Sequence, residues 1–162
     1  SLMFRIRLLI LLLVSFIILS CAKNNINDNK TSFSLGYIGG NYDGVILNNL
    51  LKSHLKSNGL YDPNSHFKIN ANAEHTGNIY ITNIDNTSDR EKITSVIYIS
   101  IINKNLNCTP YKFNDKISQF YIFSPNSNFM SNDRAKDRIK FDNTESIVKK
   151  FINDISYLNI EC

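Results

Sequence analysis

The order of apolar and polar residues along the chain predicts an alternation of strands and helices. Apolar residues at every second position of Ser32–Ile38 share one face of a short strand, and they are Phe33, Leu35 and Tyr37. The same alternation at 67–74, which resumes at 79–81, predicts a half-buried strand. Residues 93–102 are apolar on both faces, as in a central strand packed on two sides or covered by lipid or a partner. A last strand is predicted at 111–123.

Two further segments repeat apolar residues at helical spacing. Asp43 is the predicted N-cap of the first helix, and Gly59 is predicted to end it at the C′ position. The second helix is predicted from about Ser131 to Leu158, with a gap in its apolar stripe at 142–144, where we expect a kink. The first stripe comprises Ile46, Leu47, Leu50, Leu51 and Leu55, and the second comprises Ala135, Ile139, Ile147, Phe151, Ile155 and Leu158. These elements predict an α+β domain with two helices packed on one mostly antiparallel four-stranded sheet, in the order strand, helix, strands, helix.

A charged and then strongly apolar stretch precedes these elements. Arg5 and Arg7 are followed by an apolar run, Leu8–Leu19, which is shorter than the roughly 20 residues of a membrane-spanning helix. Such a run is typical of a secretory signal peptide. Ile18-Leu19-Ser20-Cys21 resembles the bacterial lipobox, whose cysteine receives a diacylglyceryl group and becomes the new amino terminus. The alternative is an uncleaved helical anchor, but the position of Cys21 where the apolar run stops favours the lipobox.

The lipobox divides the chain into three parts. Residues 1–20 are the predicted signal peptide, residues 21–31 a lipidated flexible tether, and residues 32–162 a single α+β domain. Ala22, rather than an aspartate, follows the cysteine, which by resemblance favours sorting to the outer membrane. We therefore expect a protein that is lipid-anchored on the periplasmic side of that membrane.

Charge and cysteine content narrow the function only a little. The formal charge of +4 falls to about +2 when Arg5 and Arg7 leave with the signal peptide, which is too small to argue for nucleic acid. An extracytoplasmic location permits a disulfide between Cys108 and Cys162, but two free thiols are as compatible with the sequence.

No arrangement of residues predicts catalysis or a cofactor. His54, His66 and His75 lack metal-ligand spacing, and we expect them at the surface. Asp85, Asp89 and Glu91 gather around a predicted turn, where an ion site is conceivable but a solvated turn is far commoner. The sequence therefore favours a non-enzymatic protein without a metal or cofactor.

Basic residues form a more suggestive group. They alternate at the start of the second helix and occur on the preceding strand, and they are Arg134, Lys136, Arg138, Lys140, Lys112 and Lys116. Such a cluster suits the phosphates of a lipid head group. Because Asp133, Asp137 and Asp142 are interleaved, a solvated helix face is the simpler interpretation.

Several segments together carry a family resemblance. Behind the lipobox come a first strand and the helix "DGVILNNLLKSHLKSNG", followed by "FKINANAEHTGNIYITNIDNTSDREKITSVIYISIIN", a long pair of strands with Arg90 at the start of the second. "SQFYIFSPNSNFMSNDRAKDR" has a tyrosine-containing strand end and the opening of a helix, and "ESIVKKFINDISYL" closes that helix. In this order they resemble the lipopolysaccharide-assembly lipoprotein (LptE) family of Gram-negative outer membranes.

The resemblance implies a non-catalytic role. Family members plug a large outer-membrane β-barrel, the LptD translocon, help it assemble, and contact lipopolysaccharide during its delivery to the outer leaflet. No motif of the family marks the residues that contact lipid, so we assign lipopolysaccharide contact to Lys112, Arg134 and Lys136 from the basic group described above. The alternative is an auxiliary lipoprotein of a lipid-transporting ABC system or a secretin pilot protein.

The lipobox makes the first testable prediction. Changing Cys21→Ser removes the thiol that accepts the lipid, so we expect loss of lipid labelling and accumulation of the uncleaved precursor. Metabolic labelling with a fatty acid and the mass of the mature protein measure both effects. Normal processing of the variant would refute the lipobox.

Overall fold

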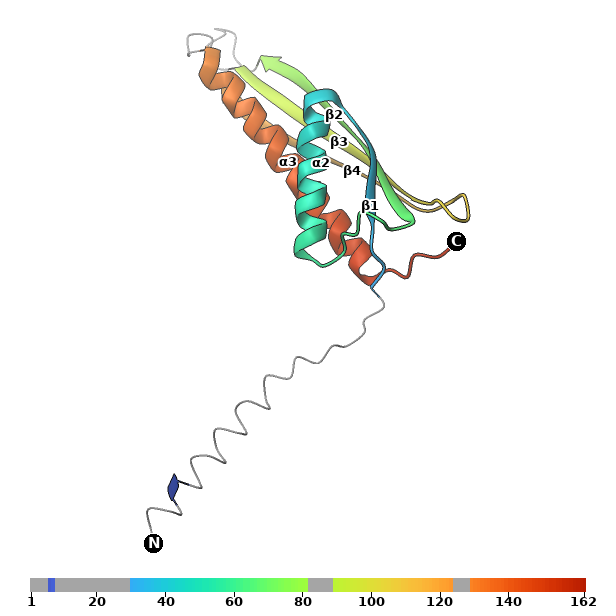
Figure 1. The fold of residues 1–162 in the computed structure, drawn as a ribbon. Coiled ribbons are helices and arrows are strands. Elements are labelled where there is room, and N and C mark those ends of the chain that lie inside the picture. Colours follow the sequence, from blue (N-terminus) through green and yellow to red (C-terminus); the bar gives the residue numbers. More distant parts are fainter. Residues whose placement is uncertain (1–5, 8–29, 82–88, 124–128) are drawn as a thin grey trace.

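The structure of the chain is a computed structural model, and it describes residues 6–7, 30–81, 89–123 and 129–162. Figure 1 shows the ribbon, with two helices lying on the same side of a sheet. In chain order the elements are β1 (Ser34–Gly39), α2 (Asn41–Ser57), β2 (Phe67–Ile81), β3 (Asp89–Asn103), β4 (Cys108–Phe123) and α3 (Phe129–Tyr157). Cys21 and most of the predicted signal peptide and tether lie outside the described residues. No helix in the described ranges is long and apolar enough to cross a membrane.

The predicted α+β class and the order strand, helix, strands, helix are confirmed. The four strands lie side by side in the order β1-β2-β3-β4. The sheet is mixed rather than mostly antiparallel, because β1 runs parallel to β2 while the other two pairs are antiparallel. Helix α2 causes the difference, since it returns the chain to the end of the sheet where β1 began.

The first helix ends as predicted but begins earlier. Gly59 has a φ of 68°, and the N–H of Leu60 donates to the carbonyl of Leu55 at 2.8 Å. A glycine is favoured there because an L side chain is strained at positive φ. The predicted N-cap at Asp43 is wrong. The cap is Gly40, and Asp43 lies in the first turn, where its charge favours the helix dipole.

The core lies between the helices and one face of the sheet. Leu47, Leu51 and Phe151 are fully buried there together with Ile69 and Ile97. Of the stripe predicted for the second helix, the part from residue 147 to 155 is buried, whereas Leu158 lies beyond the helix and is exposed. We call the opposite face of the sheet, on which no described element packs, the uncovered face.

The two ends of the domain differ in what surrounds them. Lys30 and Thr31 lie beside Tyr157 and Leu158, so the folded domain begins next to the carboxyl end of α3 (Figure 1). We call the end that carries residues 30–31, the turn at 104–107 and residues 157–162 the tether end. The opposite end carries the last residues of β2 and β4 and the first turn of α3.

A disulfide between Cys108 and Cys162 settles the alternative that the sequence left open. Their Cα atoms are 6.3 Å apart, within the ordinary range for such bridges. The bond ties the segment after α3 to the start of β4. Ile160, two residues before Cys162, is buried, so the segment after α3 is packed against the domain as well as cross-linked to it.

The disulfide predicts a loss of stability on reduction. It joins residues that are 54 positions apart in the sequence. Bridges that close loops of this length contribute about 2–4 kcal/mol to the free energy of unfolding, chiefly by restricting the unfolded chain. We expect Cys162→Ser to lower the free energy of unfolding by that amount, as measured by denaturant titration of the detergent-solubilised protein.

A reducing agent provides the control. It should destabilise the parent protein to the level of the variant and leave Cys162→Ser unchanged. Equal stability of the parent protein with and without reductant would contradict the bridge.

Candidate functional site

The uncovered face of the sheet carries aromatic and cationic side chains. Strand alternation places four large exposed apolar residues on this face, Tyr80, Tyr98, Phe120 and Ile122, and β1 adds Tyr37. Its cations are Lys68, Arg90, Lys92, Lys112 and Lys116. Among the described strand residues, Glu74 is the one carboxylate on this face. A basic and aromatic surface of this extent is available to a partner.

A β-bulge places Tyr37 on this face. Leu35 pairs with Ile69 and Ile38 pairs with Ala71, so three steps along β1 match two steps along β2. Both Leu35 and Ile38 therefore pack on the core, whereas Tyr37 is 76% exposed on the other side. The prediction that Tyr37 shares a face with Leu35 is wrong for this reason.

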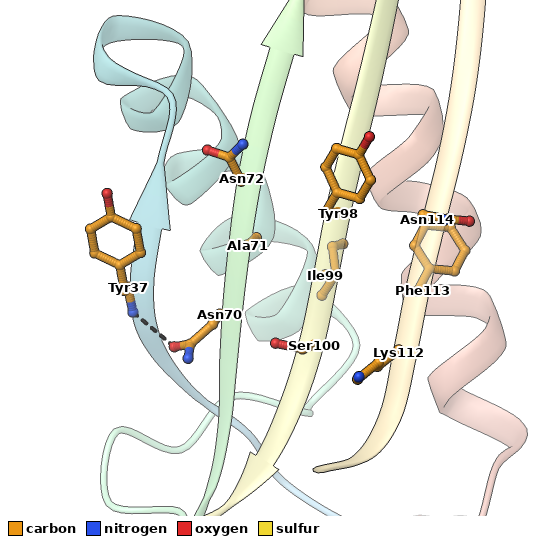
Figure 2. A pocket seen from close by; sticks show the side chains of 10 residues that line it. All are labelled: Tyr37, Asn70, Ala71, Asn72, Tyr98, Ile99, Ser100, Lys112, Phe113 and Asn114. Atoms are coloured by element: carbon orange, nitrogen blue, oxygen red, sulfur yellow. Dashed lines mark hydrogen bonds between the residues drawn. The ribbon is translucent and has the colours of Figure 1, made fainter.

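A groove of about 480 Å³ crosses the middle of the uncovered face. Figure 2 shows it from that side, with both helices behind the sheet. The outward-facing residues that line it are Tyr37, Asn70, Asn72, Tyr98, Ser100, Lys112 and Asn114. Asn70 Oδ1 accepts a hydrogen bond from the backbone N–H of Tyr37 at 2.9 Å, which joins β1 to β2 beside the bulge.

The groove offers polar groups that the folded domain does not use. Within residues 30–81, 89–123 and 129–162, the side chains of Tyr98, Ser100, Lys112 and Asn114 make no hydrogen bond or ion pair. They supply hydroxyl, amide and ammonium groups beside two aromatic rings. This chemistry suits contact with a polar chain or with the wall of another protein, and it contains no nucleophile paired with a base.

The structure does not bring the three predicted lipopolysaccharide-contact residues together. Lys112 lines the groove on the uncovered face. Lys136 belongs to α3, on the face of the sheet that the helices cover, and its Nζ is 3.0 Å from Glu91 Oε2. Arg134 is exposed near the start of α3. A single basic cluster made by all three is therefore not present.

Glu91 is the centre of a small buried cluster. It lies in β3 rather than in the turn where the sequence suggested it, and 7% of its surface is exposed. The hydroxyl of Tyr121 donates to Glu91 Oε2 at 2.6 Å, and Lys136 pairs with the same oxygen. Gly77 faces this carboxylate from β2, where a Cβ atom would collide with Glu91 Oε1. A glycine in mid-strand is thus explained by the room that the acid needs.

The charges of this cluster stabilise each other. Burial works against ionisation of Glu91, but hydrogen bonds from Tyr121 and Lys136 outweigh it and lower the pKa of the carboxyl. Burial and the bond to Glu91 raise the pKa of Tyr121 to about 12. The bond to Glu91 also raises the pKa of Lys136. Glu91 and Lys136 are therefore both charged at neutral pH, and the ammonium of Lys136 already has a partner.

A second polar network occupies the gap in the stripe of α3. Asn143 Nδ2 donates to Ser95 Oγ at 3.0 Å, and Asn143 Oδ1 accepts from Gln119 Nε2 at 2.6 Å. Ser95 Oγ lies 2.7 Å from His75 Nδ1. Helix α3 is continuous through this region, and the gap in its apolar stripe holds a buried polar contact. Asn143 was not predicted as a buried contact, and the signal that could have found it is its position inside an otherwise apolar helical stripe.

His75 is half-buried in β2, not at the surface as predicted. Burial lowers the pKa of His75, and nearby Lys140 acts in the same direction, while Asp43 opposes them. Asp43, His75 and Ser95 resemble the parts of a hydrolase triad. Ser95 is 0% exposed, however, so its hydroxyl has no access to a substrate. The network is suited to joining α3 and the sheet.

The Glu91 cluster predicts a pH-dependent stability. Because its pKa is lowered by folding, Glu91 stabilises the fold above the unfolded-state pKa of about 4.3. That contribution is lost as the pH falls through the lowered folded-state pKa. At neutral pH we expect Glu91→Gln to cost about 1–3 kcal/mol, since the half-buried partners Tyr121 and Lys136 lose a charged acceptor. The cost should shrink below about pH 4 in thermal unfolding measurements.

Glu145→Gln is a matched control. Glu145 is half-buried on α3, and its Oε1 lies 3.3 Å from Lys149 Nζ and 3.6 Å from His54 Nε2, partly exposed pairs of a kind that contributes about 0–1 kcal/mol. We expect Glu145→Gln to unfold with nearly the same pH dependence as the parent protein. If Glu91→Gln lowered the free energy of unfolding equally at neutral pH and below about pH 4, the lowered pKa of Glu91 would be contradicted.

Comparison with known proteins identifies the fold and no more. No protein-family model matches the chain, and no curated protein sequence matches it. The solved structure of a minor lipoprotein from Acinetobacter baumannii matches with a TM-score of 0.57 and 14% identity, over 78% of this chain and 91% of that one. The rare lipoprotein B from Shewanella oneidensis matches with a TM-score of 0.58 and 9% identity, over 77% and 93%. At such low identity the chain has a fold that these bacterial lipoproteins share, and its function has to be argued from its own residues.

Proposed function

We propose that the protein is a non-catalytic, lipid-anchored outer-membrane lipoprotein that plugs and helps to assemble the β-barrel through which lipopolysaccharide reaches the cell surface. In this role it also assists insertion of lipopolysaccharide into the outer leaflet. The proposal joins the lipobox at Cys21 and the resemblance to the LptE family with the likeness of the fold to two lipoproteins.

The uncovered face is the observation that carries the proposal. A sheet with helices on one side leaves its other side to water or to a partner. Here that side combines exposed rings such as Tyr98 and Phe120 with unpaired amides, hydroxyls and ammonium groups. The lumen of a membrane β-barrel is a polar wall rather than an apolar one. A mixed polar and aromatic face is complementary to such a wall, and an enclosed domain can carry it without aggregating.

The cations of the uncovered face suit a phosphorylated lipid. Lys112 has no protein partner among the described residues, and Lys116 lies four residues along the same strand. Lys92 Nζ is 5.6 Å from the ring centre of Phe120, so cation and apolar surface adjoin. Lipopolysaccharide presents phosphates beside acyl chains, and this pairing fits both. Lys112 is accordingly the best placed of the three predicted contact residues, whereas Lys136 would have to leave Glu91.

Site-specific photo-crosslinking in intact cells tests the plug. A photoreactive phenylalanine analogue in place of Tyr98, on the uncovered face, should crosslink to a large outer-membrane β-barrel protein identified by mass spectrometry. The reason is that the lumen wall would lie against this face.

The same analogue in place of Tyr157 is the matched control. Tyr157 is also an exposed tyrosine, but it lies at the tether end, outside the surface that the barrel is proposed to cover. We expect no barrel adduct there. Capture of an ATPase subunit or a secretin at position 98 would overturn the proposal in favour of another kind of accessory lipoprotein.

A further inference from the structure

The tether end carries apolar side chains that the core does not bury. Tyr157 is 84% exposed and Leu106 is 67% exposed, and about half of the surface of Leu158 is accessible. Tyr157 and Leu158 lie beside Lys30, where the described domain begins. This end therefore exposes apolar surface close to the point at which the tether leaves.

The exposure of Leu106 is built into the turn that holds it. Asn103 is buried, and its Oδ1 accepts hydrogen bonds from the backbone N–H groups of Asn105 and Leu106 at 3.0 and 3.2 Å. The N–H of Lys104 donates to the carbonyl of His66 at 3.0 Å. These bonds fix the turn and direct the leucine away from the core.

The disulfide makes the turn and the segment after α3 parts of one surface. Cys108, two residues from Leu106, is bonded to Cys162. The intervening segment from Leu158 passes through buried Ile160, so it is held against the domain. Both segments consequently lie at one end of the molecule (Figure 1).

Two lysines near the turn lack an acidic partner. Lys68 and Lys104 lie near each other, and the ammonium group of Lys68 lowers the pKa of Lys104 by repulsion. Within the described ranges neither lysine forms an ion pair with a carboxylate. The acids of this end are engaged elsewhere, since Glu161 accepts from Asn159 at 2.7 Å and Asp62 accepts from the backbone of Asn64 at 2.9 Å. An anion beside the two ammonium groups would relieve their repulsion.

The length of the chain before Lys30 limits how far this end can be from a lipid on Cys21. Nine residues span at most about 30 Å when fully extended. The 15 residues of β2 extend about 50 Å from one end of the domain to the other. An anchor on Cys21 therefore keeps the tether end near the lipid surface, while the opposite end can lie farther from the anchor by the length of the domain.

We propose that the tether end docks on the phospholipid surface that holds the anchor, with Leu106, Tyr157 and Leu158 in the interfacial layer and Lys68 and Lys104 against lipid phosphates. The inference rests on the lipid anchor of the proposed function. Aromatic and aliphatic side chains partition into the interface, and lysines next to them are attracted to anionic lipids. The occupant is lipid rather than a second protein because the chain's own anchor brings lipid to this end.

Depth-dependent quenching in vesicles tests the docking. The sequence has three cysteines, and in the full lipidated protein one is acylated and two are paired, so Leu106→Cys adds the one thiol that a fluorophore can label. Ile122→Cys is the matched control, because Ile122 is 69% exposed at the opposite end. The labelled proteins are reconstituted into vesicles of phosphatidylethanolamine and phosphatidylglycerol that contain a spin-labelled phospholipid.

We expect quenching and a blue-shifted emission at position 106 and neither effect at position 122. Replacing Lys68→Gln and Lys104→Gln together should reduce the quenching at position 106, and added salt should then have less effect than in the parent protein. Unchanged quenching in this double variant would overturn the contact of the lysines with phosphates.

The outcomes separate the docking from the anchor. Retention on the vesicles with a water-exposed label at position 106 would overturn the docking and leave the anchor intact. Quenching at position 122 instead would show the reverse orientation and also overturn it. A protein that floats free of the vesicles would contradict the lipid anchor, and with it both proposals.

Discussion

Leu47 and Leu51 of α2 and Phe151 of α3 bury their side chains against Ile69 and Ile97, and this contact fixes both helices on one face of the sheet. A fully buried side chain of this size contributes about 1.5–3 kcal/mol, so the contact between these layers dominates the packing of the domain. Its consequence is an asymmetry. Every residue of β2, β3 and β4 that points away from the helices is left to solvent or to a partner, which is why the candidate functional surface lies on strands and not in a cleft between elements.

The amino-terminal half of α3 is held differently, by polar contacts. Asn143 reaches Ser95, and Lys136 reaches Glu91, so amides and an ion pair replace the apolar contacts made nearer the tether end. Such bonds are directional and costly to leave unmade in the interior, and they restrict how α3 can slide along the sheet. These contacts could not be predicted from the sequence, because the partners are 45 to 48 residues apart and only the fold shows that they meet. The sequence did show the gap in the stripe at 142–144, and the structure shows that a buried amide, Asn143, occupies it.

Local rules predicted more of the fold than long-range ones. Gly59 ends its helix because glycine is favoured at a positive φ, a property of the residue itself, and the long strands follow from alternation that needs no knowledge of the partner. The outward position of Tyr37 depends on one extra residue in β1, and a shift of one residue reverses which face a side chain occupies. The pairing of Cys108 with Cys162 likewise could be known only from the structure, since the spacing in the sequence was compatible with two free thiols. The uncovered face could be predicted in part. Segment 93–102 is apolar on both faces, which indicated packing on two sides or a cover of lipid or a partner. No described element packs on the second side.

The two proposed contacts impose consistent demands on orientation. If the tether end rests at the level of the periplasmic lipid surface, the sheet extends from that level along the barrel axis, and the groove beside Tyr98 and Lys112 lies partway along its length. A barrel wall could then meet the uncovered face while lipid contacts Leu106, because the two surfaces occupy a face and an end and do not compete. The roughly 30 Å reach of the residues before Lys30 is shorter than the strands, so the anchored domain cannot readily invert to bring Ile122 to the same lipid. The lipid anchor would therefore do more than retain the protein at a membrane, since it would select the direction in which the domain presents its uncovered face.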